Sequence, residues 1–167
     1  MNRFYLSLGA NLGEREETLV QAVSLLRRAA CDITALSSLY ETVPWGKTDQ
    51  PDFLNAALAL RTERDGAALL AVCMDIERRL GRQRHEKWGA RTIDLDLVYS
   101  PDEECHTVNL QLPHPYLTQR AFVLVPLQEI APNLCFYGKS IDLWIHLVSQ
   151  EGQQVRRYRK GNTWKKF

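Results

Sequence analysis

The sequence predicts an α+β fold with an antiparallel sheet and two helices packed on one face of it. Strand-like runs occur at 4–10, 33–40, 53–61 and 93–99; the first is apolar, and the last two place different kinds of residue on alternate sides. Two stretches with apolar residues at helical spacing, one from about Arg15 and one over 66–80, follow the first and the third of these runs. This order is that of a ferredoxin-like βαββαβ core, and the residues after 100 are expected to add extra strands and C-terminal helices.

The composition indicates one globular domain over residues 1–167. The chain is 45% hydrophobic and 25% charged, with a net charge of +1 that gives no general attraction to nucleic acid or membranes. Its four cysteines include no Cys-x-x-Cys pair, which argues against zinc and disulfides and favours a reducing compartment. We therefore expect a cytoplasmic monomer that binds small molecules and has no nucleic-acid or membrane partner.

The first strand ends in a turn around Asn11, because Gly9 and Gly13 flank that residue. The helix that follows has an apolar stripe that includes Leu19 and Leu26. The turn lacks the third glycine of a dinucleotide-binding fingerprint, so we interpret it as a tight strand-to-helix connection.

The third strand is a candidate ligand platform. It follows a loop over 41–52, broken by prolines and a glycine, which is of a length that is usually functional or mobile. One side of the strand carries leucines and the other carries Phe53, Asn55 and small residues. A planar ligand would suit the second side, and a solvent-exposed face would tolerate the same residues.

The fourth strand carries the clearest sign of chemistry. One of its sides is predicted to hold Ile93, Leu95, Leu97 and Tyr99, and the other side Asp94 and Asp96. Two carboxylates this close raise each other's pKa unless a cation shares the site, and Mg²⁺ prefers oxygen ligands. The loop before the strand is basic, with Arg82, Arg84, Lys87 and Arg91 against one Glu86. Either feature alone is as consistent with a solvated surface, but their adjacency indicates a polyphosphate site.

The C-terminal part is predicted as a strand over 107–112, a short helical segment over 121–130 and a capped helix over 140–148. The helical segment is expected to be interrupted or to begin near Pro126. His114, between two prolines, is either a phosphate donor held on a rigid turn or an exposed loop residue. From Val155 the chain is expected to be a strand or a loose end.

Several segments, in order, resemble one enzyme family. The signature runs from Lys87 to Val98 as KWGARTIDLDLV, and it is accompanied by SLGANLG from Ser7, YETVPWG from Tyr40, DQPDFLNA from Asp49 and LPHP from Leu112. Together these segments resemble 6-hydroxymethyl-7,8-dihydropterin pyrophosphokinase of folate biosynthesis, up to about Pro132. The resemblance implies transfer of pyrophosphate from ATP to the hydroxymethyl group of the dihydropterin, with release of AMP.

The resemblance also implies roles for individual residues. Asp94 and Asp96 would bind two Mg²⁺ ions, and with Arg82 and Arg91 they would form the catalytic set. The residues expected to contact the co-substrate ATP are Glu77, Arg84, Trp88, His114 and Arg120. Those expected to contact the pterin are Thr42, Val43, Trp45, Phe53, Asn55 and Phe122.

This chain departs from some family members at Met74, Asn109 and Gln111, where adenine and ribose contacts would differ. The closest alternative is a Mg²⁺-dependent phosphoryl or nucleotidyl transferase that acts on another small acceptor. An RNA-binding module is the other alternative. It is disfavoured because aromatic residues interleaved with basic ones are missing from the central strands, and because the two aspartates would repel phosphates.

Overall fold

The computed structural model describes residues 1–44, 49–82, 91–158 and 164. At its centre is a six-stranded sheet of order β10-β3-β4-β1-β5, in which β2 also pairs with β4. The bounds are β1 (Asn2–Ala10), β2 (Asp32–Leu36), β3 (Tyr40–Thr42), β4 (Phe53–Thr62), β5 (Asp94–Tyr99) and β10 (Val155–Arg157). All pairings of these strands are antiparallel. The ferredoxin-like core is confirmed, and β10 is an added edge strand.

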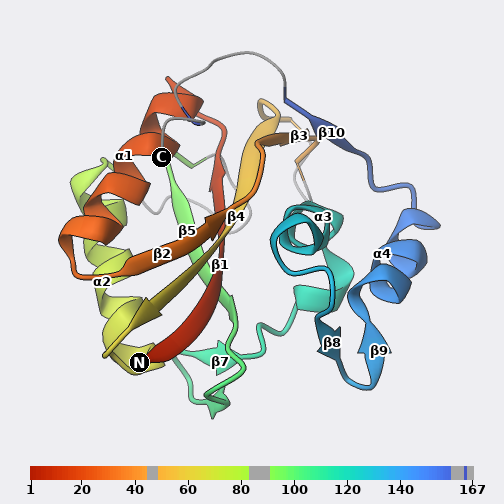
Figure 1. Cartoon of the computed structure of the whole chain (residues 1–167). Coiled ribbons are helices and arrows are strands. Elements are labelled where there is room, and N and C mark those ends of the chain that lie inside the picture. The colour runs from red at the N-terminus through yellow and green to blue at the C-terminus, as the bar shows by residue number, and fades with distance from the viewer. Residues whose placement is uncertain (45–48, 83–90, 159–163, 165–167) are drawn as a thin grey trace.

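Two pairs of helices cover the two faces of the sheet, as Figure 1 shows. On one face lie α1 (Arg15–Arg28) and α2 (Gly66–Arg79), as the sequence predicts. Their apolar stripes pack on alternate residues of β1 and β4, among them Leu6, Leu8, Leu54 and Leu58, all fully buried. This layer is the main hydrophobic core. None of the described helices is long and apolar enough to cross a membrane.

The opposite face is covered at one end by α3 (Ala121–Ile130) and α4 (Ile141–Ser149) (Figure 1). A second buried cluster joins these helices to Ala57 of β4 and Val98 of β5. Residues toward the other end of the same strands, Gly9, Asn55 and Asp94, line a pocket instead. The second helical layer therefore leaves part of this face available for a site.

The strand predicted over 33–40 is divided into β2 and β3 by Ser37. The Ser37 backbone N–H donates to the Ala57 carbonyl at 2.9 Å, but the Ala57 N–H donates to the Ser37 hydroxyl at 2.9 Å. A side-chain oxygen thus replaces a ladder carbonyl, which frees the Ser37 carbonyl for another donor. The break occurs because serine offers the neighbouring strand this alternative acceptor.

The strand predicted over 107–112 is confirmed only at 111–112 and is wrong over 107–110. Residues 107–110 form a turn between β6 (Cys105–His106) and β7 (Gln111–Leu112), closed by a 2.9 Å bond from the Thr107 N–H to the Leu110 carbonyl. The Thr107 hydroxyl also accepts from the Leu110 N–H at 3.0 Å, so a local side-chain bond favours the turn over a strand.

The prediction for 121–130 is also wrong in one respect, because α3 is a single helix with Pro126 inside it. A hairpin of β8 (Cys135–Phe136) and β9 (Lys139–Ser140), which the sequence analysis did not predict, precedes α4. Tyr137 and Gly138 join its strands with positive φ angles of 49° and 73°. Ser140 caps α4 as predicted, by accepting from the Leu143 N–H at 3.2 Å.

Tyr99 does not share a side with Leu95 and Leu97, contrary to the prediction. The pairing of β1 with β5 shifts register between Tyr5, which faces Tyr99, and Leu6, which faces Leu97. This irregularity turns Tyr99 toward the second cluster, where its ring stacks on Tyr5 at a centroid distance of 6.0 Å. The sides of Leu95, Leu97, Asp94 and Asp96 are as predicted.

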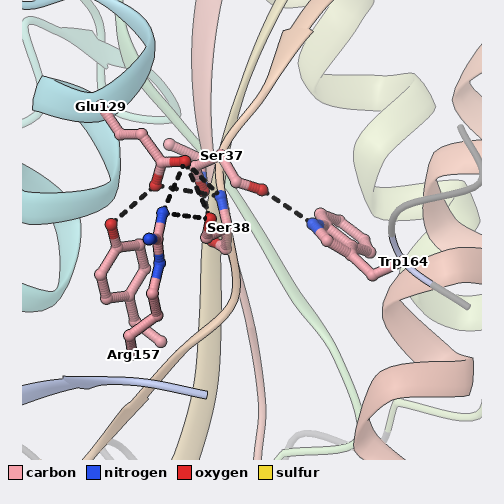
Figure 2. Close-up of polar contacts among 7 residues, drawn as sticks. Ser37, Ser38, Glu129, Arg157 and Trp164 are labelled. Carbon is pink, nitrogen blue, oxygen red and sulfur yellow. Dashed lines mark hydrogen bonds and ion pairs between the residues drawn. The ribbon is translucent and has the colours of Figure 1, made fainter. Parts of the chain in front are cut away.

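The break at Ser37 is where three distant segments meet (Figure 2). The Glu129 carboxylate of α3 accepts from the Ser38 N–H at 3.0 Å and from the Tyr40 hydroxyl at 2.6 Å. Arg157 of β10 approaches the same carboxylate at 3.3 Å. On the other side of the strand, the Trp164 indole N–H donates to the Ser37 carbonyl at 2.8 Å. These hydrogen bonds and the ion pair thus connect the edge of the sheet to α3 and to the C-terminal segment.

We expect Glu129→Gln to destabilise the protein by about 1 kcal/mol at neutral pH, because a charge-assisted acceptor is lost at a partly exposed position. Burial raises the pKa of Glu129, but the Tyr40 and Ser38 hydrogen bonds outweigh it and leave the pKa below the ordinary value of 4.5. The stabilisation is therefore present above that ordinary pKa and is lost as pH falls through the folded-state pKa.

Thermal melts of the wild type and the Glu129→Gln variant across this pH range check the prediction. Glu63→Gln is the matched control, because the Glu63 side chain is 80% exposed and lies 3.9 Å from the N-terminal ammonium. A melting temperature for Glu129→Gln equal to that of the control at neutral pH would contradict the role of Glu129.

Candidate active site

A pocket lies on the sheet face that α3 and α4 leave partly uncovered. Strands β1, β4 and β5 form its floor, since Gly9 pairs with both Asn55 and Asp94, and Ser7 pairs with Asp96. The residues that line it are Ser7, Gly9, Thr42, Val43, Phe53, Asn55, Arg91, Asp94, Asp96, Arg120 and Phe122. Most of the residues singled out in the sequence therefore come together at one place.

Asp94 is held by two arginines. Arg82 donates to one carboxylate oxygen at 2.8 Å, and Arg91 donates to the other. Arg82 also contacts the nearly buried Glu77, whose carboxylate accepts from the Leu95 N–H at 2.8 Å. Burial raises the pKa of Glu77, although the Leu95 N–H and Arg82 oppose it. Glu77 thus ties the end of α2, through Arg82, to the strand that carries the aspartates.

Asp96 is less well compensated than Asp94. The nearest described cation is Arg120, whose Nη1 atom lies 3.8 Å from the Asp96 carboxylate, and the Asp96 side chain is 33% exposed. Burial and then repulsion from Asp94 raise the pKa of Asp96, and Arg120 and Arg91 only partly oppose this. A cation between the two carboxylates would relieve the repulsion, so this residue pair suits a divalent metal ion.

The far wall of the pocket carries a buried amide and two aromatic rings. The Asn55 side chain is 2% exposed and donates to the Thr42 hydroxyl at 2.6 Å. Glycine suits the position opposite it, because a Cβ atom on Gly9 would lie only 3.0 Å from the Asn55 amide oxygen. Phe53 of β4 and Phe122 of α3 add two aromatic rings. An amide edge and two rings can bind a flat heteroaromatic molecule.

His114 lies in an adjoining hollow on the other side of Asp96. That hollow is lined by Leu70, Leu95, Asp96, Leu97, Val108, Asn109, Leu110, Gln111, His114 and Pro115. The His114 ring accepts from the Tyr116 N–H at 3.1 Å through Nδ1, so the neutral ring carries its proton on Nε2. Burial and then Arg120 lower the pKa of His114 to about 4. Asp96 lines both spaces, whereas Asp94 lines only the first pocket, so Asp96 is the carboxylate that lies between them.

Comparison with known sequences assigns this arrangement to a family. Residues 5–132 match the sequence model of the 7,8-dihydro-6-hydroxymethylpterin-pyrophosphokinase (HPPK) family. The chain belongs to the HPPK family. A protein of Methylorubrum extorquens named 2-amino-4-hydroxy-6-hydroxymethyldihydropteridine pyrophosphokinase is 45% identical over 142 residues, which are 84% of this chain and 90% of that protein. The protein of the same name from Bacillus subtilis is 41% identical over 161 residues, which are 96% of this chain and 93% of that protein.

Solved structures agree on the fold. Plasmodium falciparum HPPK-DHPS with pteroate superposes with a TM-score of 0.71 at 16% identity, over 90% of this chain and 43% of that chain. A crystal structure of HPPK-DHPS in complex with substrates gives a TM-score of 0.69 at 15% identity, over 90% of this chain and 44% of that chain. This chain thus spans less than half of those chains, and at this identity the likeness concerns the fold alone.

Most of the HPPK site residues predicted from the sequence lie in or beside the two spaces. Around the first pocket are Thr42, Val43, Phe53, Asn55, Arg91, Asp94, Asp96, Arg120 and Phe122. Arg82 and Glu77 lie behind Asp94, and His114 lines the adjoining hollow. Three predicted site residues, Trp45, Arg84 and Trp88, lie outside the described residues.

Asn11 is a site-supporting residue that the sequence analysis did not single out. Its side chain is 2% exposed, accepts from the Arg91 N–H at 2.7 Å and donates to the Gln50 side chain at 2.9 Å. It therefore fixes Arg91 and the loop before β4 together. Its position between two glycines was a signal for the turn, but its partners are 39 and 80 residues away in the sequence.

We expect the His114 ring to remain neutral down to acidic pH. Its NMR resonances should stay constant from about pH 8 to pH 5 and change near the lowered pKa of about 4. In the unfolded chain the ordinary pKa is 6.5, so the unfolded state takes up the proton first as pH falls. His114 should therefore make the protein less stable below about pH 6.5, and His114→Gln should reduce this loss. Titration of the ring near its ordinary pKa would contradict the burial.

Proposed function

We propose a division of roles among these residues for the reaction that membership of the HPPK family gives this chain. That reaction is transfer of the pyrophosphoryl group of ATP to the hydroxymethyl group of 6-hydroxymethyl-7,8-dihydropterin, in folate biosynthesis. Membership of this family decides against the alternative, a transferase that acts on another small acceptor. The observation that carries the proposed roles is that Asp94 and Asp96 line one pocket with two aromatic rings, while Asp96 also lines the adjoining hollow that contains His114.

Asp94 and Asp96 are proposed to bind two Mg²⁺ ions together with ATP. Among the described residues there is no group of three or more His, Cys, Asp or Glu side chains that could hold a metal alone. Two carboxylates suit Mg²⁺, which is usually held by one or two carboxylates, water and substrate phosphates. When bound, the ions would neutralise the triphosphate and polarise the phosphoryl group under attack.

Arg82 and Arg91 are proposed to bind the phosphates that are transferred. Both guanidinium groups contact Asp94, and each has further N–H donors. Arginine binds phosphate oxygens in bidentate fashion, so the same groups can orient the triphosphate for in-line attack. Arg120, next to Asp96, and the neutral His114, through its Nε2–H, are proposed as further ATP contacts. Glu77, Arg84 and Trp88 complete this proposed set.

The pterin is proposed to stack between Phe53 and Phe122, with its amide-like edge read by Asn55 and Thr42. The bond between Asn55 and Thr42 sets the orientation of the amide before the ligand binds, which lowers the entropic cost of recognition. Val43 and Trp45 are proposed to complete the wall. In this position the hydroxymethyl group would point along β5 toward the two aspartates.

Three further features are proposed and rest on the sequence. Residues 1–167 are proposed to act as a single pyrophosphokinase domain, as a monomer, and in the cytoplasm. The absence of a Cys-x-x-Cys pair supports a reducing compartment. The net charge of +1 supports a role with small molecules.

The carboxylate pair provides the test of these roles. Asp96→Ala should lower turnover by about 10³-fold, because the site loses a ligand for the ions that neutralise the triphosphate. Its melting temperature should stay the same or rise, since a repulsion with Asp94 is removed. Asp94→Ala should also lose turnover, but with a lower melting temperature, because Arg82 and Arg91 lose their shared partner.

Turnover and melting temperature are measured for both variants with Mg²⁺, ATP and the pterin alcohol. Asp75→Ala is the control, because Asp75 lies on α2 and pairs with Arg78 and Arg79 on the exposed surface. Near-normal turnover of Asp96→Ala would rule out the metal-binding role.

A further inference from the structure

The segment after α4 returns to the candidate site. It lies beyond the match to the HPPK family, which ends at residue 132. Gly152, with a φ angle of +79°, turns the chain at the end of α4, and the chain then enters β10 beside β3 (Figure 1). There Val155 pairs with Thr42, which is one of the pocket residues. The C-terminal segment thus contacts one wall of the pocket directly.

Gln153 connects the same segment to the opposite wall. Its side-chain oxygen accepts from the Ala121 N–H at 2.9 Å, and its side-chain nitrogen donates to the Gln119 carbonyl at 2.8 Å. These two backbone groups lie on either side of Arg120. The Gln153 amide therefore bonds to the backbone on both sides of Arg120, although Gln153 lies 32 residues later in the chain than Ala121.

The Ala121 N–H is one of the helix-start donors that need a partner. In the described part of the chain, Arg120 is the capping residue of α3 but makes no side-chain hydrogen bond to the helix. The first N–H groups of a helix have no partner within the helix, and a side-chain oxygen commonly supplies one. Gln153 supplies it here from another segment, so the start of α3 is ordered by a residue of the C-terminal segment.

The residues at that helix start face the pocket. The Arg120 guanidinium lies 3.8 Å from Asp96 and 5.6 Å from the centre of the Phe122 ring. Both Arg120 and Phe122 line the pocket. A second hollow is lined by Thr42 and Phe122 of the pocket together with the residues from Glu151 to Val155. A shift of the helix start would therefore move an aromatic wall and a cation at once.

We propose that Gln153 is a positioning residue for the pyrophosphoryl transfer. It holds the start of α3 so that Phe122 stacks on the pterin and Arg120 stays beside Asp96. This inference rests on the roles proposed above for Arg120 and Phe122. Misplacing such groups by about 1 Å can reduce a rate by as much as 10²-fold, so two hydrogen bonds outside the pocket can matter for catalysis.

The test compares Gln153→Met, Gln153→Glu and the control Gln154→Met. Methionine keeps the length of the side chain but removes both hydrogen bonds. Glutamate keeps an acceptor for the Ala121 N–H, and its charge is favourable at a helix N-terminus. The neighbouring Gln154 is exposed, and the structure gives its side chain no hydrogen bond with the described residues. Pterin affinity is measured by fluorescence with a non-hydrolysable Mg²⁺-ATP analogue present, and kcat, KM and melting temperature are measured in parallel.

We expect Gln153→Met to weaken pterin binding and to lower kcat/KM for the pterin, each by about tenfold. Gln153→Glu should bind the pterin more tightly than Gln153→Met, and Gln154→Met should match the wild type. A Gln153→Met variant with a lower melting temperature but wild-type pterin affinity and kcat would overturn the proposal, because Gln153 would then be a purely structural residue. An equal loss in Gln154→Met would overturn it too.

Phe122→Ala separates this inference from the proposed site. If Phe122→Ala leaves pterin affinity unchanged, the proposed pterin pocket is wrong and the role of Gln153 falls with it. If Phe122→Ala weakens pterin binding and Gln153→Met does not, the pocket stands and the positioning role alone is overturned.

Discussion

The charge balance at the start of β5 is the constraint on which the rest of the site depends. Two aspartates on one strand face would repel each other, and the fold compensates them unequally. Asp94 is held by Arg82 and Arg91, whereas Asp96 has Arg120 at 3.8 Å and a raised pKa. Glu77 extends this balance into α2, so the helix, the strand and the basic residues at its edge form one electrostatic unit. The site is therefore prepared for added positive charge next to Asp96 and for added negative charge next to the arginines.

The sheet makes this balance possible by separating two kinds of surface. One face is filled by α1 and α2, and its leucines supply most of the hydrophobic stabilisation. The other face is covered at one end by α3 and α4, so Asn55, Phe53 and Asp94 can remain polar or aromatic without exposing the core. Gly9 suits this arrangement, because a Cβ atom there would lie only 3.0 Å from the Asn55 amide oxygen. Stability and ligand binding are thus assigned to opposite faces of the same strands.

Sequence alternation was enough to predict the core order of elements and the common face of Phe53, Asn55, Asp94 and Asp96, because side-chain direction in a strand follows a period of two. It failed where one residue changes that period, as at the register shift that turns Tyr99 and at the Ser37 hydroxyl that divides β2 from β3. It also did not identify Asn11 and Gln153, whose partners lie far away in the chain. Arg120 and Phe122 were assigned only by the family resemblance, which also favoured one of the two roles that the flanking prolines left open for His114, because local patterns carry no information on such long-range contacts.

The most direct test of the account is a crystal structure with Mn²⁺ in place of Mg²⁺, a non-hydrolysable ATP analogue and the pterin alcohol. The account predicts two anomalous peaks at about 2.1 Å from carboxylate oxygens of Asp94 and Asp96, close to the octahedral distance of such ions. It also predicts that Arg82 and Arg91 contact phosphate oxygens and that the pterin ring lies between Phe53 and Phe122. Peaks bound only by phosphates and water, with both aspartates still paired to arginines, would contradict it.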